Sequence, residues 1–222
     1  MEKLKAIESR ILEFKEQGLS AFATSSFQSH SIPLLHIISR FDKSIPIYYL
    51  NTGYLFPETL SFKDQLQDLL GMEFIGLESS IPKSQQRDSS GQLFFTSDPD
   101  YCCYLNKTQP LEPILQSKDI WINGIRADQS KTRAAMGEFE DTPQGAKRYH
   151  PMLHWTSKEI WEYRKEFDLP SHPLEAKGYL SIGCEPCTRK MSLETDERSA
   201  RWFGMNKVEC GLHTDLVKKE EA

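Results

Sequence analysis

Apolar residues along the chain recur with two different periods, which predicts that helices and strands alternate. Residues 4–14 carry apolar side chains at helical spacing, and this pattern stops at Gly18. Short apolar runs predict buried strands in four places, at residues 19–24, 45–50, 72–77 and 119–125. Further helical patterns cover residues 31–41, the stretch that opens near Pro57, and the stretch from the capping box of Thr156 and Glu159 to Pro170.

Strands that alternate with helices in this way indicate parallel pairing through right-handed crossovers. We therefore expect an α/β protein with an open, mostly parallel twisted sheet flanked by helices. Ligands bind such sheets at the carboxyl ends of the strands. The loops that follow three of the predicted strands, residues 25–30, 51–54 and 124–133, are therefore expected to share one cleft.

Two stretches lie outside this regular pattern. Residues 78–100 are polar, broken by Gly and Pro, and too long for an ordinary connection, so we interpret them as a surface excursion near the cleft. Beyond Pro170 the pattern becomes irregular. A chain of 222 residues favours one core with an appended segment. We expect an α/β domain over residues 1–195 and an irregular C-terminal segment over residues 196–222.

Charge and hydropathy argue against two classes of partner. A formal net charge of −5 does not favour binding to the phosphate backbone of nucleic acid. No apolar run approaches the roughly 20 residues that a membrane-spanning helix needs, so we expect no membrane partner. Residues 1–18 carry acidic side chains at intervals and lack the apolar core of an export signal, which favours a cytoplasmic, thiol-reducing location.

Four of the five cysteines form two close pairs. Cys102 and Cys103 are adjacent, and Cys184 and Cys187 form a Cys-x-x-Cys motif. Adjacent thiols do not readily form a disulfide because the small ring distorts its torsion, whereas Cys-x-x-Cys sulfurs can face one metal centre. We interpret the four as metal ligands. An iron-sulfur cluster, whose irons lie several ångströms apart, suits adjacent cysteines better than one zinc ion, which stays a second interpretation.

The fifth cysteine, Cys210, lies near the C-terminus and is followed by Gly211. Chain ends are mobile unless they are docked, so a nucleophile there can enter a cleft and leave it. The alternative is a surface thiol without a role. His213 is a candidate to assist the thiolate or to contact a substrate.

Six stretches, in this order, resemble the assimilatory sulfonucleotide reductases: LNTGYLFPETL, GIRADQSKTR, YHPMLHWTSKEIWEY, GYLSIGCEPCTR, ERSARWFG and ECGLH. With both cysteine pairs present, the chain is most similar to the adenylyl-sulfate reductases that carry a 4Fe-4S cluster. The resemblance implies an adenine nucleotide alpha hydrolase-like fold and, in sulfate assimilation, the reduction of adenosine 5′-phosphosulfate (APS) to sulfite and AMP. It also implies attack by Cys210 to give an S-sulfocysteine, thioredoxin or glutaredoxin as reductant, and a homo-oligomer.

The resemblance further implies which residues hold the substrate. Cationic side chains should neutralise the leaving phosphate, and arginine can hold its oxygens with two bonds at once. The loop with Ser25 and Ser26 stands where related ATP pyrophosphatases have SGGxDS, but it lacks the glycines and the aspartate. The substrate-binding candidates are Ser25, Ser26, Lys107, Arg126, Arg133, Arg198, Arg201 and His213. Asn106 and Ala127 stand where the family often has arginine.

Three other functions remain as alternatives. Reduction of 3′-phosphoadenosine 5′-phosphosulfate (PAPS) would need a further cationic contact at the ribose 3′ position. An ATP-using adenylyl transferase or pyrophosphatase could use the same scaffold, although the missing SGGxDS loop disfavours it. In a non-enzymatic metal-binding redox sensor, Cys210 would be incidental.

Overall fold

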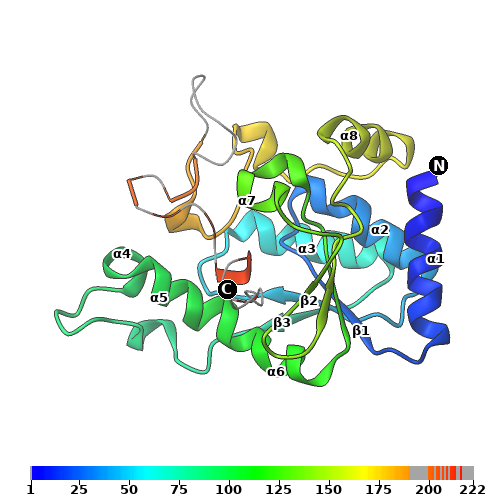
Figure 1. Ribbon diagram of the computed structural model, residues 1–222. Helices are drawn as coiled ribbons and strands as arrows, with labels where there is room; N and C mark the ends of the chain where they lie inside the picture. Colours follow the sequence, from blue (N-terminus) through cyan, green and yellow to red (C-terminus); the bar gives the residue numbers. More distant parts are fainter. Residues whose placement is uncertain are drawn as a thin grey trace.

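The computed structural model describes residues 2–190 and, beyond them, residues 200–202, 204, 205, 207, 209, 211–213 and 216. Its centre is a six-stranded sheet with the order β3-β2-β1-β4-β6-β5 (Figure 1). The strands are β1 (Ala21–Thr24), β2 (Ile47–Leu50), β3 (Phe74–Leu77), β4 (Ile120–Asn123), β5 (Phe139–Asp141) and β6 (Lys147–Tyr149). All neighbouring strands pair in parallel except β5 and β6, which are antiparallel. The predicted open, mostly parallel α/β sheet is confirmed.

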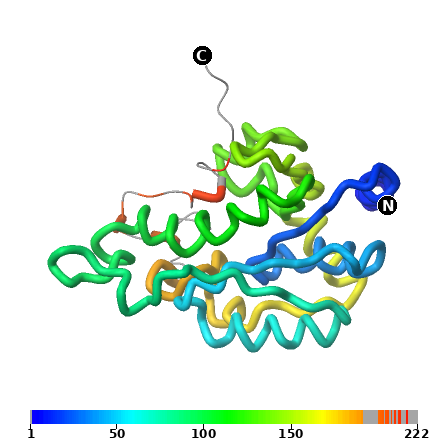
Figure 2. The backbone as a smooth tube through the Cα atoms, turned by 90° about the horizontal axis from the view of Figure 1, so that it is seen from below, coloured from blue at the N-terminus to red at the C-terminus, as the bar shows by residue number. Residues whose placement is uncertain are grey.

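Helices cover both faces of the sheet, as Figures 1 and 2 show. The α-helices are α1 (Glu2–Glu16), α2 (Ile32–Phe41), α3 (Pro57–Leu70), α4 (Phe94–Ser97), α5 (Pro99–Cys103), α6 (Gln109–Ser117), α7 (Lys131–Ala134) and α8 (Ser157–Glu166). Helices α1, α2, α3 and α8 share one core with Ala23 and Ile122, whereas α6 shares another with Phe22 and Trp121. Successive strand residues thus face opposite layers, as the period of two in a strand requires.

The adjacent cysteines lie on a helix that the apolar pattern does not predict. Helix α5 continues without a break into a π-helical segment, η3 (Tyr104–Thr108), and then into α6. A π-helical turn carries an extra residue, and such turns occur often at functional sites. In this turn Asn106 Nδ2 donates to the carbonyl oxygen of Cys102 at 2.9 Å. The extra residue and Pro113 in α6 both disturb the helical period, which explains why the sequence pattern misses this helix.

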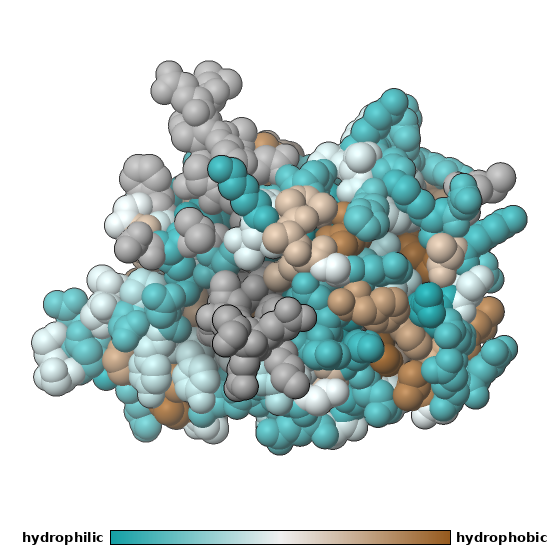
Figure 3. Space-filling view, viewed as in Figure 1, coloured by the Kyte–Doolittle hydropathy of each residue, from teal (hydrophilic) through white to brown (hydrophobic). Residues whose placement is uncertain are grey.

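The sequence predicts four of the strands and four of the longer helices, but misses the sheet edge formed by β5 and β6. Residues 78–98 form a loop with two short elements, η2 (Lys83–Gln85) and α4, in an arm that extends from the body of the protein (Figure 1). This arm agrees with the expected surface excursion. On the face drawn in Figure 3, the apolar groups of the described residues are small and separated by hydrophilic side chains.

The predicted boundary between residues 195 and 196 lies outside the described residues. Beyond it, Leu216 is buried and packs with Phe22, Leu111 and Trp121 on one face of the sheet. This described part of the C-terminal segment therefore shares a core with the α/β domain. Among the described residues, no helix has the length and apolar character needed to cross a membrane.

Candidate active site

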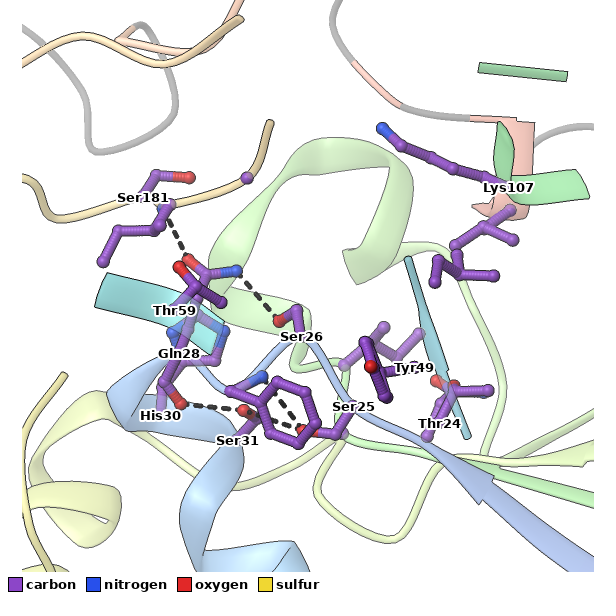
Figure 4. A pocket seen from close by; sticks show the side chains of 18 of the residues that line it. Thr24, Ser25, Ser26, Gln28, His30, Ser31, Tyr49, Thr59, Lys107 and Ser181 are labelled. Carbon is purple, nitrogen blue, oxygen red and sulfur yellow. Dashed lines mark hydrogen bonds between the residues drawn. The ribbon is translucent and has the colours of Figure 1, made fainter. Parts of the chain in front are cut away.

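A pocket of about 210 Å³ opens at the carboxyl ends of β1, β2 and β4 (Figure 4). Residues from all three predicted loops line it, including Ser26 after β1, Thr52 after β2 and Gln129 after β4. The expectation that these loops share one cleft is confirmed. The segment before the Cys-x-x-Cys motif, residues 180–184, closes another side of the pocket.

Ser25 and Ser26 lie in the pocket on the loop that follows β1. Ser25 Oγ accepts a hydrogen bond from the backbone N–H of Phe27 at 3.1 Å, and Gln28 Nε2 donates to Ser26 Oγ at 3.1 Å. Phe27 has φ of 56°, a left-handed conformation that is costly for an aromatic residue, and its ring is 1% exposed in the core. Burial of the ring therefore fixes this turn and sets both serines toward the pocket.

Three of the predicted cationic residues, Lys107, Arg133 and Arg201, line the same pocket. In Figure 4, Lys107 stands apart from the serine loop, on another side of the pocket. Arg133 and Glu209 are both buried, and Arg133 Nε lies 3.3 Å from Glu209 Oε1. The pocket therefore combines hydroxyl donors on one side with positive charge on others, which suits an anionic ligand.

Arg201 lies directly against the backbone of Gly183. A Cβ atom at Gly183 would stand 2.2 Å from Nη2 of Arg201, so any other residue would displace the guanidinium group. The guanidinium carbon also lies 4.5 Å from the ring centroid of Trp202. Both neighbours hold Arg201 at the pocket wall.

The structure places Arg126 in a different pocket from Ser25, Ser26, Lys107, Arg133 and Arg201. Its side chain is 3% exposed and lines a second cavity beside α8. There its Nε donates to Asp128 Oδ1 at 2.9 Å, and its Nη2 donates to Ser157 Oγ at 2.9 Å. Arg126 is therefore not brought together with Arg133 and Lys107.

The cysteines of the two sequence pairs are all free thiols, and together they line one small cavity. The aromatic rings of Tyr54 and Phe95 also line this cavity, which makes it apolar apart from the sulfurs and a few donors. Cys102 and Cys103 reach it from consecutive positions of one helix, whereas Cys184 and Cys187 reach it from the opposite loop. Among the described residues, no three Cys, His, Asp or Glu side chains form a group that fits one metal ion.

Polar groups stand within hydrogen-bond distance of three of the four sulfurs. Lys107 Nζ lies 3.4 Å from Cys103 Sγ, Thr52 Oγ1 lies 3.3 Å from Cys184 Sγ, and Asn106 Nδ2 lies 3.7 Å from Cys102 Sγ. Burial, and then the neighbouring sulfurs, raise the pKa of Cys102 to about 12, and burial also raises the pKa of Cys187. The thiols of Cys102 and Cys187 are thus protonated at neutral pH unless a cationic centre binds them.

Asn106 stands where the family often has arginine, and here its side chain makes structural contacts. Its side chain is 3% exposed and exchanges two amide hydrogen bonds with Gln86, at 2.6 and 2.9 Å. It joins the extended arm to the cysteine helix and lines the cysteine cavity but not the larger pocket. Asn106 therefore has a structural place beside Cys102.

Two predicted residues, Cys210 and Arg198, lie outside the described residues. His213 lies in the short helix η7 (Gly211–His213), and only its backbone is described. Two sequence neighbours of Cys210 are described: Glu209 pairs with Arg133, and Leu212 lines the larger pocket.

Sequence reasoning singled out neither Gln28 nor Asn123, which line the pocket, nor Glu209, which pairs with the pocket residue Arg133. Gln28 links the serine loop to the cysteine loop, because Ile182 N–H donates to its Oε1 at 2.8 Å. Asn123, the last residue of β4, is 4% exposed and lines the pocket, and neither end of its amide has a partner among the described residues. A polar residue at the carboxyl end of a predicted central strand is a signal that would have found Asn123.

Two known proteins are similar to this chain in sequence. Adenosine 5′-phosphosulfate reductase of Chelativorans sp. (strain BNC1) is 38% identical over 93% of this chain and 84% of its own length. Phosphoadenosine 5′-phosphosulfate reductase of Gloeobacter violaceus is also 38% identical, over 85% of this chain and 80% of its own length.

Solved structures share the fold. Phosphoadenylyl-sulfate reductase from Candida auris superimposes with a TM-score of 0.69 over 82% of this chain and 88% of its own, at 18% identity. FMN adenylyltransferase of Candida glabrata gives a TM-score of 0.55 over 79% of this chain and 59% of its own, at 14% identity. Residues 20–190 match the model of the phosphoadenosine phosphosulfate reductase domain. The chain therefore belongs to the phosphoadenosine phosphosulfate reductase family.

Proposed function

We propose that this protein is an oxidoreductase of sulfate assimilation that reduces APS to sulfite and AMP. One observation carries this proposal: Lys107 lines both the larger pocket and the cavity of the four cysteines. A pocket with hydroxyl donors, Arg133 and Arg201 suits a phosphosulfate group. The reductases of Chelativorans and Salinibacter ruber, which are named for APS, are 38% and 34% identical to this chain.

We further propose that Cys102, Cys103, Cys184 and Cys187 hold a 4Fe-4S cluster. The residues present fit it: four thiols reach one apolar cavity from two elements, and donors stand beside three of the sulfurs. When bound, the cluster supplies local charge that acts on the neighbouring pocket through Lys107. Zinc on the same thiols is the alternative, and metal analysis separates the two.

The reaction needs a thiolate and a stabilised leaving group. In the proposed mechanism the Cys210 thiolate attacks the sulfur of APS, an S–S bond forms, and the S–O bond breaks with its electron pair on the departing AMP phosphate. Lys107, Arg133 and Arg201, with Arg198 as a further candidate, neutralise the charge that this phosphate gains.

The sulfite leaves when a second thiol attacks Cys210. A dithiol reductant of the thioredoxin or glutaredoxin type donates a thiolate to the Cys210 sulfur, and the S–S bond to sulfite breaks with its electron pair on sulfite. The second thiol of the reductant then resolves the mixed disulfide and regenerates the Cys210 thiol. We propose a cytoplasmic homo-oligomer in which residues 1–195 bind nucleotide and cofactor, and residues 196–222 carry the nucleophile.

The main alternative is reduction of PAPS, because the Gloeobacter relative is named for that activity. Sulfite release from APS and from PAPS, each with a dithiol reductant, discriminates between them. The proposal expects a clear preference for APS, loss of turnover in Cys210→Ser, and about four irons and four sulfides per chain after anaerobic purification. Preference for PAPS contradicts the substrate, and zinc contradicts the cofactor. ATP–pyrophosphate exchange would favour an adenylyl transferase, whereas full sulfite release in Cys210→Ser would exclude the proposed nucleophile.

A further inference from the structure

A second pocket, of about 180 Å³, lies beside the larger one. Its lining comes from the loop after β1, from Arg126 after β4, from one face of α8 with Trp161 and Arg164, and from residues 175–182. Gln28 and His30 line both pockets and form part of the wall between them. The two pockets are therefore separate but adjacent.

Arg126 brings a buried cation with an unused donor to this second pocket. Its Nε and Nη2 nitrogens are engaged with Asp128 and Ser157. Its Nη1 nitrogen is fully buried and has no hydrogen-bond partner among the described residues. A guanidinium nitrogen carries two N–H donors here, and buried donors of this kind are normally paired.

Arg164 brings a second cation that has a buried donor without a partner among the described residues. Its Nη2 nitrogen donates to Ser171 Oγ and to the Pro170 carbonyl, and its Nε nitrogen is buried without a partner in the described part of the chain. Glu175, a carboxylate in the lining, lies 3.9 Å from Arg164 Nη1 and also accepts a hydrogen bond from Ser29. The existing carboxylate therefore leaves the Nε donor of Arg164 unused.

The N-terminus of α8 does not account for this pocket. Its first turn is already capped, because Thr156 Oγ1 accepts from Glu159 N–H and Asp128 accepts from the Ser157 N–H. Attraction for an anion comes instead from two arginine side chains with spare donors. We propose that this pocket is an accessory anion site that binds a tetrahedral phosphate or sulfate group through Arg126 and Arg164.

The size and the shared wall fit this proposal. A volume of 180 Å³ corresponds to roughly six water molecules in the liquid, which accommodates a tetrahedral oxyanion. Gln28 in the wall holds Ser26 on one side and Ile182 on the other. An anion in the second pocket therefore acts on the serine loop of the first, and by linkage a nucleotide in the first pocket changes the affinity for the anion.

Isothermal titration calorimetry of the full chain tests this with inorganic phosphate, in the presence of saturating AMP that fills the larger pocket. The proteins are wild type, Arg164→Gln, Arg126→Lys and, as a charge-matched control that lines neither pocket, Arg10→Gln. We expect one phosphate per chain in wild type and control, and at least tenfold weaker binding in both pocket variants. Melting temperatures without phosphate establish that each variant folds, and Arg164→Gln suffices if Arg126→Lys does not.

A second arm identifies the source of the anion. If adenosine 3′,5′-bisphosphate binds wild type more tightly than AMP and Arg164→Gln removes this difference, the pocket takes a phosphate of the same nucleotide. If inorganic phosphate binds and no such difference exists, the pocket takes a free anion. Equal phosphate affinity in all four proteins overturns the proposal, and so does binding that disappears in Arg133→Gln but persists in Arg164→Gln. Absence of both phosphate binding and a preference for the bisphosphate also overturns it.

Discussion

Lys107 Nζ lies 3.4 Å from Cys103 Sγ, while the same side chain lines the larger pocket. Lys107 is four positions after Cys103, so the two side chains project from neighbouring turns of one helix. Lys107 lies in the π-helical segment η3, and its side chain lines both cavities, whereas Cys103 lines only the smaller one. This pair joins the proposed substrate site to the proposed cofactor site.

Replacing Lys107 should affect both sites at once. In Lys107→Gln we expect APS to bind about tenfold more weakly or worse, because a charge-assisted hydrogen bond contributes about 1.5–3 kcal/mol. We also expect the visible absorption of the iron-loaded protein to stop responding to APS. Titration of both properties, with Lys63→Gln as a control outside both cavities, measures this. Unchanged binding and an unchanged response would refute coupling through Lys107.

Glu209 should stabilise Arg133 when no nucleotide is bound. The pair is buried, so removing its carboxylate takes a buried ion-pair partner from Arg133 and lowers the free energy of unfolding by about 3 kcal/mol. We therefore expect Glu209→Gln to melt at a lower temperature than wild type. Its melting temperature should also rise more than that of wild type when AMP is added. Thermal melts with and without AMP measure this. The control Glu162→Gln breaks only an exposed pair, and a Glu209→Gln curve like that control would contradict the role.

Asn123 should contact the nucleotide. Its buried amide has no partner at either end among the described residues, and it stands at the end of the central strand β4. We expect Asn123→Ala to weaken AMP binding about tenfold, since one or two hydrogen bonds are lost. Equilibrium titration with AMP compares it with Asn51→Ala, whose amide bonds to Glu78 outside the pocket. Equal affinities in the two variants would show that Asn123 does not face the ligand.

His172 should make the fold sensitive to acid. Its Nδ1 accepts from the Leu174 N–H at 3.2 Å and its Nε2 lies 3.0 Å from Thr59 Oγ1, so the ring is neutral. Burial lowers the pKa of His172 from 6.5 to about 4. Between these values the unfolded chain binds more protons, so the stability conferred by the neutral ring is fully present above pH 6.5 and falls toward pH 4.

Urea unfolding at pH 7.0 and 5.0 measures this dependence. In His172→Gln we expect lower stability at pH 7.0 than in wild type, but a smaller loss between the two pH values. His150, whose pKa burial also lowers to about 4, contributes the same trend in both proteins and cancels in the comparison. An identical loss in both proteins would assign the acid sensitivity to other groups.

The sequence alone determined the alternation of strands and helices and three of the loops that line the pocket. Apolar period and parallel pairing place those loops at one edge of the sheet, so Ser25, Ser26 and Arg133 could be found together. The four cysteines could be grouped from their spacing alone, because they form one adjacent pair and one Cys-x-x-Cys pair in a chain with a single further cysteine. These features depend on local pattern, which a sequence carries directly.

Only the tertiary structure decided which candidates share a cavity. Arg126 and Arg133 are seven residues apart, yet the turn between them sends one beside α8 and the other into the larger pocket. The cysteine helix and the sheet edge of β5 and β6 also escaped the pattern, since a π-helical turn and short strands give no sustained period. Glu209 acquires its place beside Arg133 from packing between distant segments. Such placement depends on which surfaces the folded chain buries, and local periodicity does not contain that information.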